Sequence, residues 1–136
     1  MNYWIIKSEP FKYSFDQMKA DKTTIWDGVR NYEARNNLRS MKEGDICFFY
    51  HSNEEKSIVG TVTVSKEHFP DPTIDDERWL AVEVKYKAKA KHPLALATVK
   101  MHSILSNMSL VRRSRLSVAP VSPAEAEIIL QLLEGK

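Results

Sequence analysis

The stretch YWIIKSEP, residues 3–10, decides how the fold begins. Its apolar part, residues 3–7, is rich in aromatic and β-branched side chains and predicts a β-strand. Pro10 closes this strand, because proline cannot donate to the hydrogen-bond ladder of a sheet. The strand leads directly into a hydroxyl, Ser8, and a carboxylate, Glu9. Two interpretations are open: both residues belong to an ordinary turn, or the strand delivers them to the mouth of a pocket.

Composition indicates one soluble globular domain that covers residues 1–136, with 43% hydrophobic and 28% charged residues. No apolar run approaches the roughly 20 residues of a membrane-spanning helix, so no membrane partner is expected. The start MNYWIIK lacks the basic region and the cleavage site of a secretory signal, which predicts a cytoplasmic protein. Cys47 lies in an apolar run and is expected to be a buried thiol.

Charge is nearly balanced, with 20 basic and 18 acidic side chains, and a net charge of +2 alone does not predict nucleic-acid binding. The distribution is more informative. Acidic residues gather in 71–77, which is expected to be a solvated loop, whereas basic residues gather in 30–39, 85–91 and 112–115. A basic face is therefore possible.

Further strands are predicted from apolar and alternating runs. The run 46–50 is continuously apolar, which favours a strand covered on both faces, and Gly60 is expected to mark a bulge or a close approach. In 79–91 a lysine-rich face alternates with an apolar one, and these lysines are interpreted as a solubilising face that discourages edge pairing. The predicted strands after the first are 46–50, 58–64, 79–91 and 116–118, the last stopped by Pro120.

Helices are predicted by capping signals and by periodicity. Ser14 and Gln17 have the spacing of a capping box, and Ser122 begins a final helix with its own capping box. From Asn31, an apolar stripe at helical spacing predicts a helix that ends at Gly44, and another helix is expected over 95–105. Trp26 lies in a segment without periodicity. Together these elements predict an α+β fold built on a curved sheet or a small barrel.

Motifs for catalysis and for cofactors are missing from the sequence. Neither GxGxxG nor GxxxxGK[ST] occurs, so a nucleotide-cofactor fold has little support and no cofactor is expected. The four histidines lack metal-ligand spacing, and the acidic stretch 71–77 lacks the central glycine of an EF-hand loop, so no metal site is expected. No nucleophile–histidine signature appears, which favours a binding module without catalysis.

Several polar and aromatic residues suit the reading of a flat ring, although each also has a structural interpretation. Trp26, next to Asp27, is either a core plug or a stacking platform. Glu9 could accept a hydrogen bond from the exocyclic amine of a base, and His51 is either a satisfied structural histidine or a contact. The arginines of 30–39 and 112–115 either form solvated faces or contact phosphates.

Longer motifs carry a resemblance to a known family. YWIIKSEP at the start, TTIWDGVRNYEARNNLRSMKEGD at 23–45, FFYHSN at 48–53 and SRLSVAPVSPAE at 114–125 resemble the EVE domain, a member of the PUA-like superfamily. The resemblance runs over nearly the whole chain. It implies a PUA-like mixed β pseudo-barrel flanked by helices, with a cavity for a modified nucleobase. The related YTH domain similarly places an IKS-type strand end and a tryptophan around a methylated adenine.

The resemblance implies a site in which a methylated or hydroxymethylated base is turned out of its strand. Trp26 would cover one face of the base, and arginines would hold the nucleic-acid backbone. The remaining pocket residues would address the edge of the base or close the opposite side. The implied pocket consists of Ser8, Glu9, Trp26, Asp27, Asn31, Tyr32 and His51, and the implied backbone contacts are Arg35, Arg39, Arg113 and Arg115.

Two other function classes stay open at this point. An enzyme would use Glu9 or Asp27 with His51, and a small-molecule binder would use the same cavity with little dependence on salt. The sequence does not decide between DNA and RNA, since that choice depends on a contact to the sugar 2′-hydroxyl. Which modification is read is equally open.

Overall fold

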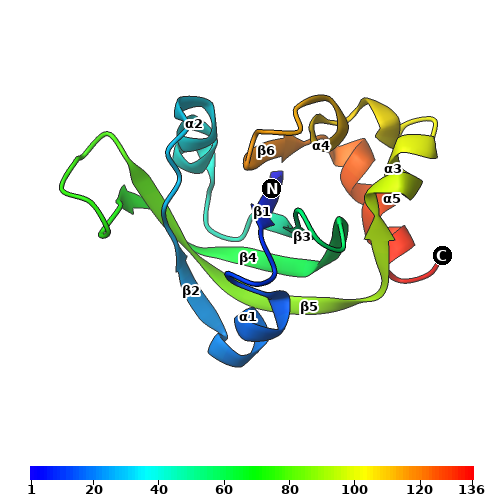
Figure 1. Ribbon diagram of the computed structural model, residues 1–136, viewed down its shortest axis with the longest axis horizontal. Coiled ribbons are helices and arrows are strands. Elements are labelled where there is room, and N and C mark those ends of the chain that lie inside the picture. Colours follow the sequence, from blue (N-terminus) through cyan, green and yellow to red (C-terminus); the bar gives the residue numbers. More distant parts are fainter.

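The structure is a computed structural model that describes residues 1–136. Strands and helices are interspersed along the chain (Figure 1). In chain order the elements are β1 (Tyr3–Ser8), α1 (Phe15–Asp21), β2 (Thr23–Trp26), α2 (Tyr32–Ser40), β3 (Ile46–His51), β4 (Ser57–Pro70), β5 (Leu80–Ala95), α3 (Leu96–Met101), η1 (Leu105–Asn107), α4 (Ser109–Arg112), β6 (Val118–Val121) and α5 (Pro123–Leu133).

All six strands form one sheet in the order β2-β5-β4-β3-β1-β6. Only β1 and β3 run parallel, so the sheet is mixed. Helices flank it, with α3, α4 and α5 grouped at one end and α2 towards the other (Figure 1). The expected α+β class with a mixed, helix-flanked sheet is confirmed. The sheet is open, however, because β2 and β6 are its edges and no ladder joins them, so a closed barrel is excluded.

Strand β3 explains why the sheet needs helices on both faces. Cys47 and Phe49 point into one hydrophobic core, and Phe48 and Tyr50 point into a second. Alternate side chains of a strand face opposite sides, so the continuous apolar run of β3 requires two cores. The expectation of a strand covered on both faces is confirmed, as is the burial of Cys47.

Gly60 lies where two elements approach closely, as its position in a β-branched run predicted. The register between β4 and β5 shifts between Ile58 and Gly60. A Cβ atom at this position would overlap the ring of Phe15 and approach the carbonyl oxygen of Ala88 to 2.7 Å. Glycine therefore allows the first residue of α1 to pack flat against the sheet.

Strand β5 is longer than expected, and the helix after it is shorter. The strand continues to Ala95 because Leu94 pairs with Ile58 of β4, so the helix predicted over 95–105 occupies only Leu96–Met101. Pro93 is accommodated within the strand. Beyond Lys85, β5 has no partner on its β2 side, and a proline is tolerated at such an edge.

Two other boundaries differ from the prediction. The last strand is Val118–Val121 and not 116–118, since β6 is an edge strand in which Pro120 can pair with Trp4 of β1 without a donor on the outer side. Helix α2 ends at Ser40, before Gly44. Its buried stripe, formed by Ala34 and Leu38 with Met41 just beyond, is confirmed.

Helix starts follow their capping signals. The side chains of Ser122 and Glu125 form the complete capping box that the sequence predicted for α5. Ser14 caps α1 as expected, but only half of its predicted box forms, because the side chain of Gln17 donates to Asp21 at 2.8 Å. Trp26, which the sequence placed in an irregular segment, is the last residue of strand β2.

Candidate functional site

A cavity of about 270 Å3 opens at the end of strand β2. Trp26 stands in its wall with its ring edge-on to Phe49 at 5.5 Å and to Tyr13 at 6.3 Å, measured between ring centroids. The indole is half-buried, so it both packs on the core and faces the cavity. The contact with the core agrees with the core-plug interpretation, and the stacking platform stays a prediction. The lining residues are Tyr13, Thr24, Ile25, Trp26 and Asp27.

Tyr13 is a cavity residue that the sequence reasoning missed. It ends the turn after β1, where the hydroxyl of Ser8 donates to the Tyr13 carbonyl oxygen at 2.6 Å and the Tyr13 amide donates to the Glu9 carbonyl oxygen at 3.0 Å. Its phenol donates to Asp21 at 2.8 Å. Burial raises the pKa of Tyr13 to about 12, so the ring stays neutral. In the sequence, the turn-forming residues Ser8, Glu9 and Pro10 could have indicated this position, because a turn there directs the chain back towards the end of the strand.

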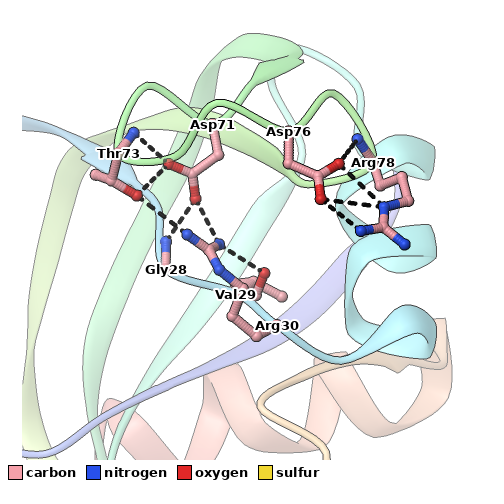
Figure 2. Close-up of polar contacts among 7 residues, drawn as sticks. All are labelled: Gly28, Val29, Arg30, Asp71, Thr73, Asp76 and Arg78. Carbon is pink, nitrogen blue, oxygen red and sulfur yellow. Dashed lines mark hydrogen bonds and ion pairs between the residues drawn. The ribbon is translucent and has the colours of Figure 1, made fainter.

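The segment that follows the cavity residue Asp27 is held by a buried carboxylate, Asp71 (Figure 2). It accepts hydrogen bonds from the Gly28 amide at 2.8 Å, from Arg30 Nη1 at 2.9 Å, and from the hydroxyl and amide of Thr73 at 2.6 and 2.8 Å. Gly28 has a φ of 77°, a conformation that favours glycine. Asp71 is 2% exposed, so the expectation that all of 71–77 is solvated was wrong for this residue. Its four donors replace the water that burial removes.

The pKa values of Asp71 and Asp27 are shifted in opposite directions. Desolvation opposes the ionisation of Asp71, but the hydrogen bonds from Thr73, Arg30 and Gly28 outweigh it and lower the pKa to about 2. For Asp27, desolvation at the cavity rim and then repulsion from Asp71 raise the pKa above its usual value. The charged Asp71 therefore makes Asp27 easier to protonate.

Ser8 and Glu9 line a second, wholly polar hollow of about 400 Å3. The Glu9 carboxylate accepts from Asn53 Nδ2 at 2.7 Å and pairs with Lys12 at 3.2 Å. Lys7 donates to the Ser114 carbonyl oxygen at 3.0 Å, and burial lowers its pKa. The hydrogen bond from Ser8 to Tyr13 joins the two hollows. The lining residues are Lys7, Ser8, Glu9, Lys12, Ser52, Asn53, Ser114, Arg115 and Ser117.

Asn31 and His51 use their side chains within the fold. Asn31 caps α2, accepting from the Ala34 amide at 2.9 Å. His51 is 6% exposed, and its Nε2 accepts from the Phe15 amide at 3.0 Å. Because Nε2 accepts, Nδ1 carries the proton and donates to Glu55 at 2.7 Å. Neither side chain lines either hollow.

Tyr32 lies outside both hollows, in an exposed stack of rings and guanidinium groups. Its ring is 52% exposed and stacks on Trp79 with 5.0 Å between centroids. The guanidinium carbon of Arg35 lies 5.2 Å from the Tyr32 centroid, and that of Arg30 lies 5.7 Å from the Trp79 centroid. Since Arg30 also binds Asp71, this stack ties the loop before β5 to the segment that carries Asp27.

The four arginines expected to hold a backbone are in different situations. Arg113 pairs with Glu33, and Arg35 donates to Asn36 and to the Arg78 carbonyl oxygen. Arg39 makes no ion pair, and Arg115 lines the polar hollow beside Ser8. The structure thus brings Trp26 and Asp27 together in one hollow and Ser8, Glu9 and Arg115 together in the other.

No group of three or more His, Cys, Asp or Glu side chains is arranged to hold a metal ion. None of the helices combines the length and the apolar character that crossing a bilayer requires.

Comparison with known proteins first defines the class of protein: the mixed, helix-flanked sheet is shared with solved structures that cover 99–100% of this chain. The model of the EVE domain matches residues 2–132. The chain belongs to the EVE domain family, as its motifs indicated. Thymocyte nuclear protein 1 of chicken is 38% identical over 98% of this chain and 69% of its own length, and the human protein is 36% identical over 98% and 74%.

Solved structures agree with this assignment. Rpa0253 from Rhodopseudomonas palustris superposes with a TM-score of 0.94 at 39% identity, covering 99% of this chain and 94% of that chain. Human THYN1, solved in complex with 5-methylcytosine containing DNA, has a TM-score of 0.94 at 36% identity, covering 100% and 99%. The ASCH protein from Zymomonas mobilis shares the fold alone, with a TM-score of 0.62 at 11% identity, covering 96% and 95%.

Proposed function

We propose that this protein is a non-catalytic reader of a modified base in DNA, with 5-methylcytosine as the base. The observation that carries the proposal is the likeness of the entire chain to human THYN1, which was solved with DNA that contains this base. The cavity at Trp26 supports it. A volume of about 270 Å3 lies just below the usual range of small-molecule pockets, which suits one ring better than a whole cofactor.

The base leaves its stack before it enters the cavity, which costs a few kcal/mol. Stacking on Trp26 returns about 1–3 kcal/mol. The indole is well prepared for this, because Phe49 and Tyr13 contact it edge-on and hold its plane in place before the ligand arrives. Stacking alone therefore roughly offsets the cost of extrusion, and polar contacts must select the base.

Asp27 is the group in the cavity that can identify a cytosine, because a carboxylate accepts a hydrogen bond from the N4 amino group. Ile25, which is 43% exposed, offers apolar contact for the 5-methyl group. One methyl group in an apolar site is worth about 1–3 kcal/mol, which corresponds to a preference of roughly 10- to 200-fold.

The polar hollow receives the backbone beside the extruded base in this scheme. Lys7 and Arg115 supply positive charge there, and Ser8 positions Tyr13 through its hydrogen bond to the carbonyl oxygen. Contacts of this kind fix the register of the strand without reading its sequence. Asn31 and His51 support the fold around the cavity, as their internal hydrogen bonds indicate.

The test is direct binding of short oligonucleotides, single- and double-stranded, DNA and RNA, whose central base is cytosine, 5-methylcytosine or 5-hydroxymethylcytosine. We expect the methylated DNA to bind best, with a preference of at least about 10-fold over cytosine. Trp26→Ala should abolish this preference. Tyr3→Ala is the matched control, since it removes another half-buried aromatic ring, which packs on Phe48 outside the cavity.

A wild-type protein that binds all bases equally would contradict the proposal. The same samples also test the rival functions. Oligonucleotides recovered chemically unchanged support a reader, whereas turnover that is lost in Asp27→Asn would indicate an enzyme. Affinity for a free base with no dependence on salt would indicate a small-molecule binder.

A further inference from the structure

A group of three lysines surrounds one aromatic ring at the junction of α1, β2 and β5. Lys19, Lys22 and Lys85, with Tyr86, line a hollow of about 350 Å3, called here the lysine hollow. None of the three lysines lies within ion-pair distance of a carboxylate, unlike Lys89 and Lys91 of the same strand, which pair with Asp16 and Glu134. The Tyr86 ring is fixed against Phe15 with 5.4 Å between centroids. Unpaired cations around a rigid floor suit a polyanion.

The backbone of Lys22 is held in an unfavourable conformation. Its φ is 69° and its ψ is −46° at the end of α1, where glycine is the usual residue. Such a conformation is strained for a non-glycine residue and persists only where the surroundings impose it. Here the Lys22 carbonyl oxygen accepts from the Tyr86 amide at 2.7 Å, and its own amide donates to Met18. The position of the Lys22 backbone beside Tyr86 is thus fixed.

The lysine hollow lies one short strand away from the Trp26 cavity. Thr23, at the start of β2, is opposite Lys85, and Trp26, at its end, is opposite Val82. Three residues of strand span roughly 10 Å, about the rise of three nucleotides at 3.4 Å each. The side chains of Lys85 and Trp26 point to opposite faces of the sheet, so a nucleic-acid strand that reaches both hollows passes round the free edge of β2 (Figure 1).

We propose that the lysine hollow binds the phosphates of the same nucleic-acid strand whose base enters the Trp26 cavity, about three nucleotides from that base. This inference rests on the proposed function, because it requires the chain to bind nucleic acid. The inference also assigns two different roles to the lysines of β5. Lys87, Lys89 and Lys91 flank a part of the strand without a partner on one side, where charge discourages edge pairing, whereas Lys85 faces the ligand.

The test compares two triple variants of equal charge. The first variant, Lys19→Gln/Lys22→Gln/Lys85→Gln, removes the three positive charges of the lysine hollow. The control is Lys66→Gln/Lys100→Gln/Lys136→Gln, because its three lysines are also exposed and make no ion pair. Each phosphate contact contributes about 0.7–0.9 to the slope of log K against log salt. We expect the slope for methylated DNA to decrease in magnitude by about 1.5–2.5 in the first variant and by less than about 0.5 in the control.

Neutral methylphosphonate groups, placed one at a time along the DNA, locate the contact. In the wild type they should weaken binding about three nucleotides from the methylated base on one side, and this effect should vanish in the first variant. A slope that decreases no more than in the control overturns the inference, while a retained preference for methylcytosine leaves the proposed function standing. A decreased slope without base preference supports the lysine hollow and contradicts the reader. A wild type that binds no nucleic acid overturns both.

Discussion

The backbone amide of Gly28 donates a hydrogen bond of 2.8 Å to the buried carboxylate of Asp71, which lies 43 residues further along the chain. The same carboxylate oxygen accepts from Arg30, so the loop that precedes β5 holds the backbone on both sides of Val29 (Figure 2). Val29 is buried. Asp27 directly precedes Gly28, so the shape of the cavity wall depends on Asp71, although Asp71 itself lines no part of the cavity.

Asp71→Asn should lower the free energy of unfolding by about 1–3 kcal/mol at neutral pH. The amide keeps the shape of the side chain but presents an NH2 group to donors, which leaves buried hydrogen bonds unmade. Chemical denaturation measures this loss. Asp75→Asn is the control, since Asp75 is exposed in the same loop and makes no ion pair, and it should change stability by less than about 0.5 kcal/mol.

The pH dependence of stability gives a second readout for the same variant. The pKa of Asp71 is lowered to about 2 in the folded state, against roughly 3.9 in an unfolded chain, so the unfolded state binds the proton more readily. The contribution of Asp71 is therefore complete above about pH 5 and is lost as the pH decreases towards 2. Asp71→Asn should flatten this part of the profile. An unchanged profile would show that Asp71 is not the titrating group.

Much of the sheet could be predicted from local patterns, because the strands that form its centre are buried on one or both faces. The apolar run of β3 required an apolar core on both faces, and the alternation at the start of β5 required a core on one face. The structure contains these cores. Strand β2 was missed because it is four residues long and lies at an edge, where only one face needs an apolar side chain. Pairing with β5, and not its own pattern, makes it a strand.

The cavity residues next to Trp26 could be predicted in part, since Asp27 is its neighbour in sequence. Tyr13 had only the turn after β1 as a signal, and the burial of Asp71 could not be predicted, because it depends on contacts between distant segments. The loop 71–77 contains four acidic residues, and nothing in its composition indicates which one is taken into the interior. That choice follows from the position of the Gly28 amide and of Arg30, which only the folded chain defines.

Gly60→Ala should destabilise the fold by about 1–3 kcal/mol, because the new methyl group would overlap the Phe15 ring and the Ala88 carbonyl oxygen. Thermal or chemical unfolding measures the effect. Phe15→Leu removes the far end of the ring, so the double variant should lose less stability than the sum of the two single variants. Strict additivity would show that the ring does not cause the loss.

His51→Leu should lower stability by about 1–3 kcal/mol, since the buried Phe15 amide loses its acceptor. His51→Gln supplies a side-chain oxygen and should recover part of this loss. Under conditions where each variant is folded, the preference for methylcytosine should persist. Loss of the preference with unchanged stability would instead assign His51 to the base contact that the family resemblance implied.

Asp27→Asn tests how the base is selected. An ionised carboxylate only accepts hydrogen bonds, whereas a protonated carboxyl also presents an O–H donor to the N4 amino group, and desolvation together with Asp71 raises the pKa of Asp27 above its usual value. The affinity of the wild type for methylated DNA should therefore decrease as the pH is lowered through this raised pKa. Asp27→Asn should reduce the preference over thymine, whose O4 accepts where the cytosine N4 donates, and should remove this part of the pH dependence. Because the titration of the base itself is common to both proteins, the difference between their two profiles isolates Asp27. Identical profiles of affinity against pH for the two proteins would show that backbone groups of the cavity wall, and not Asp27, select the base.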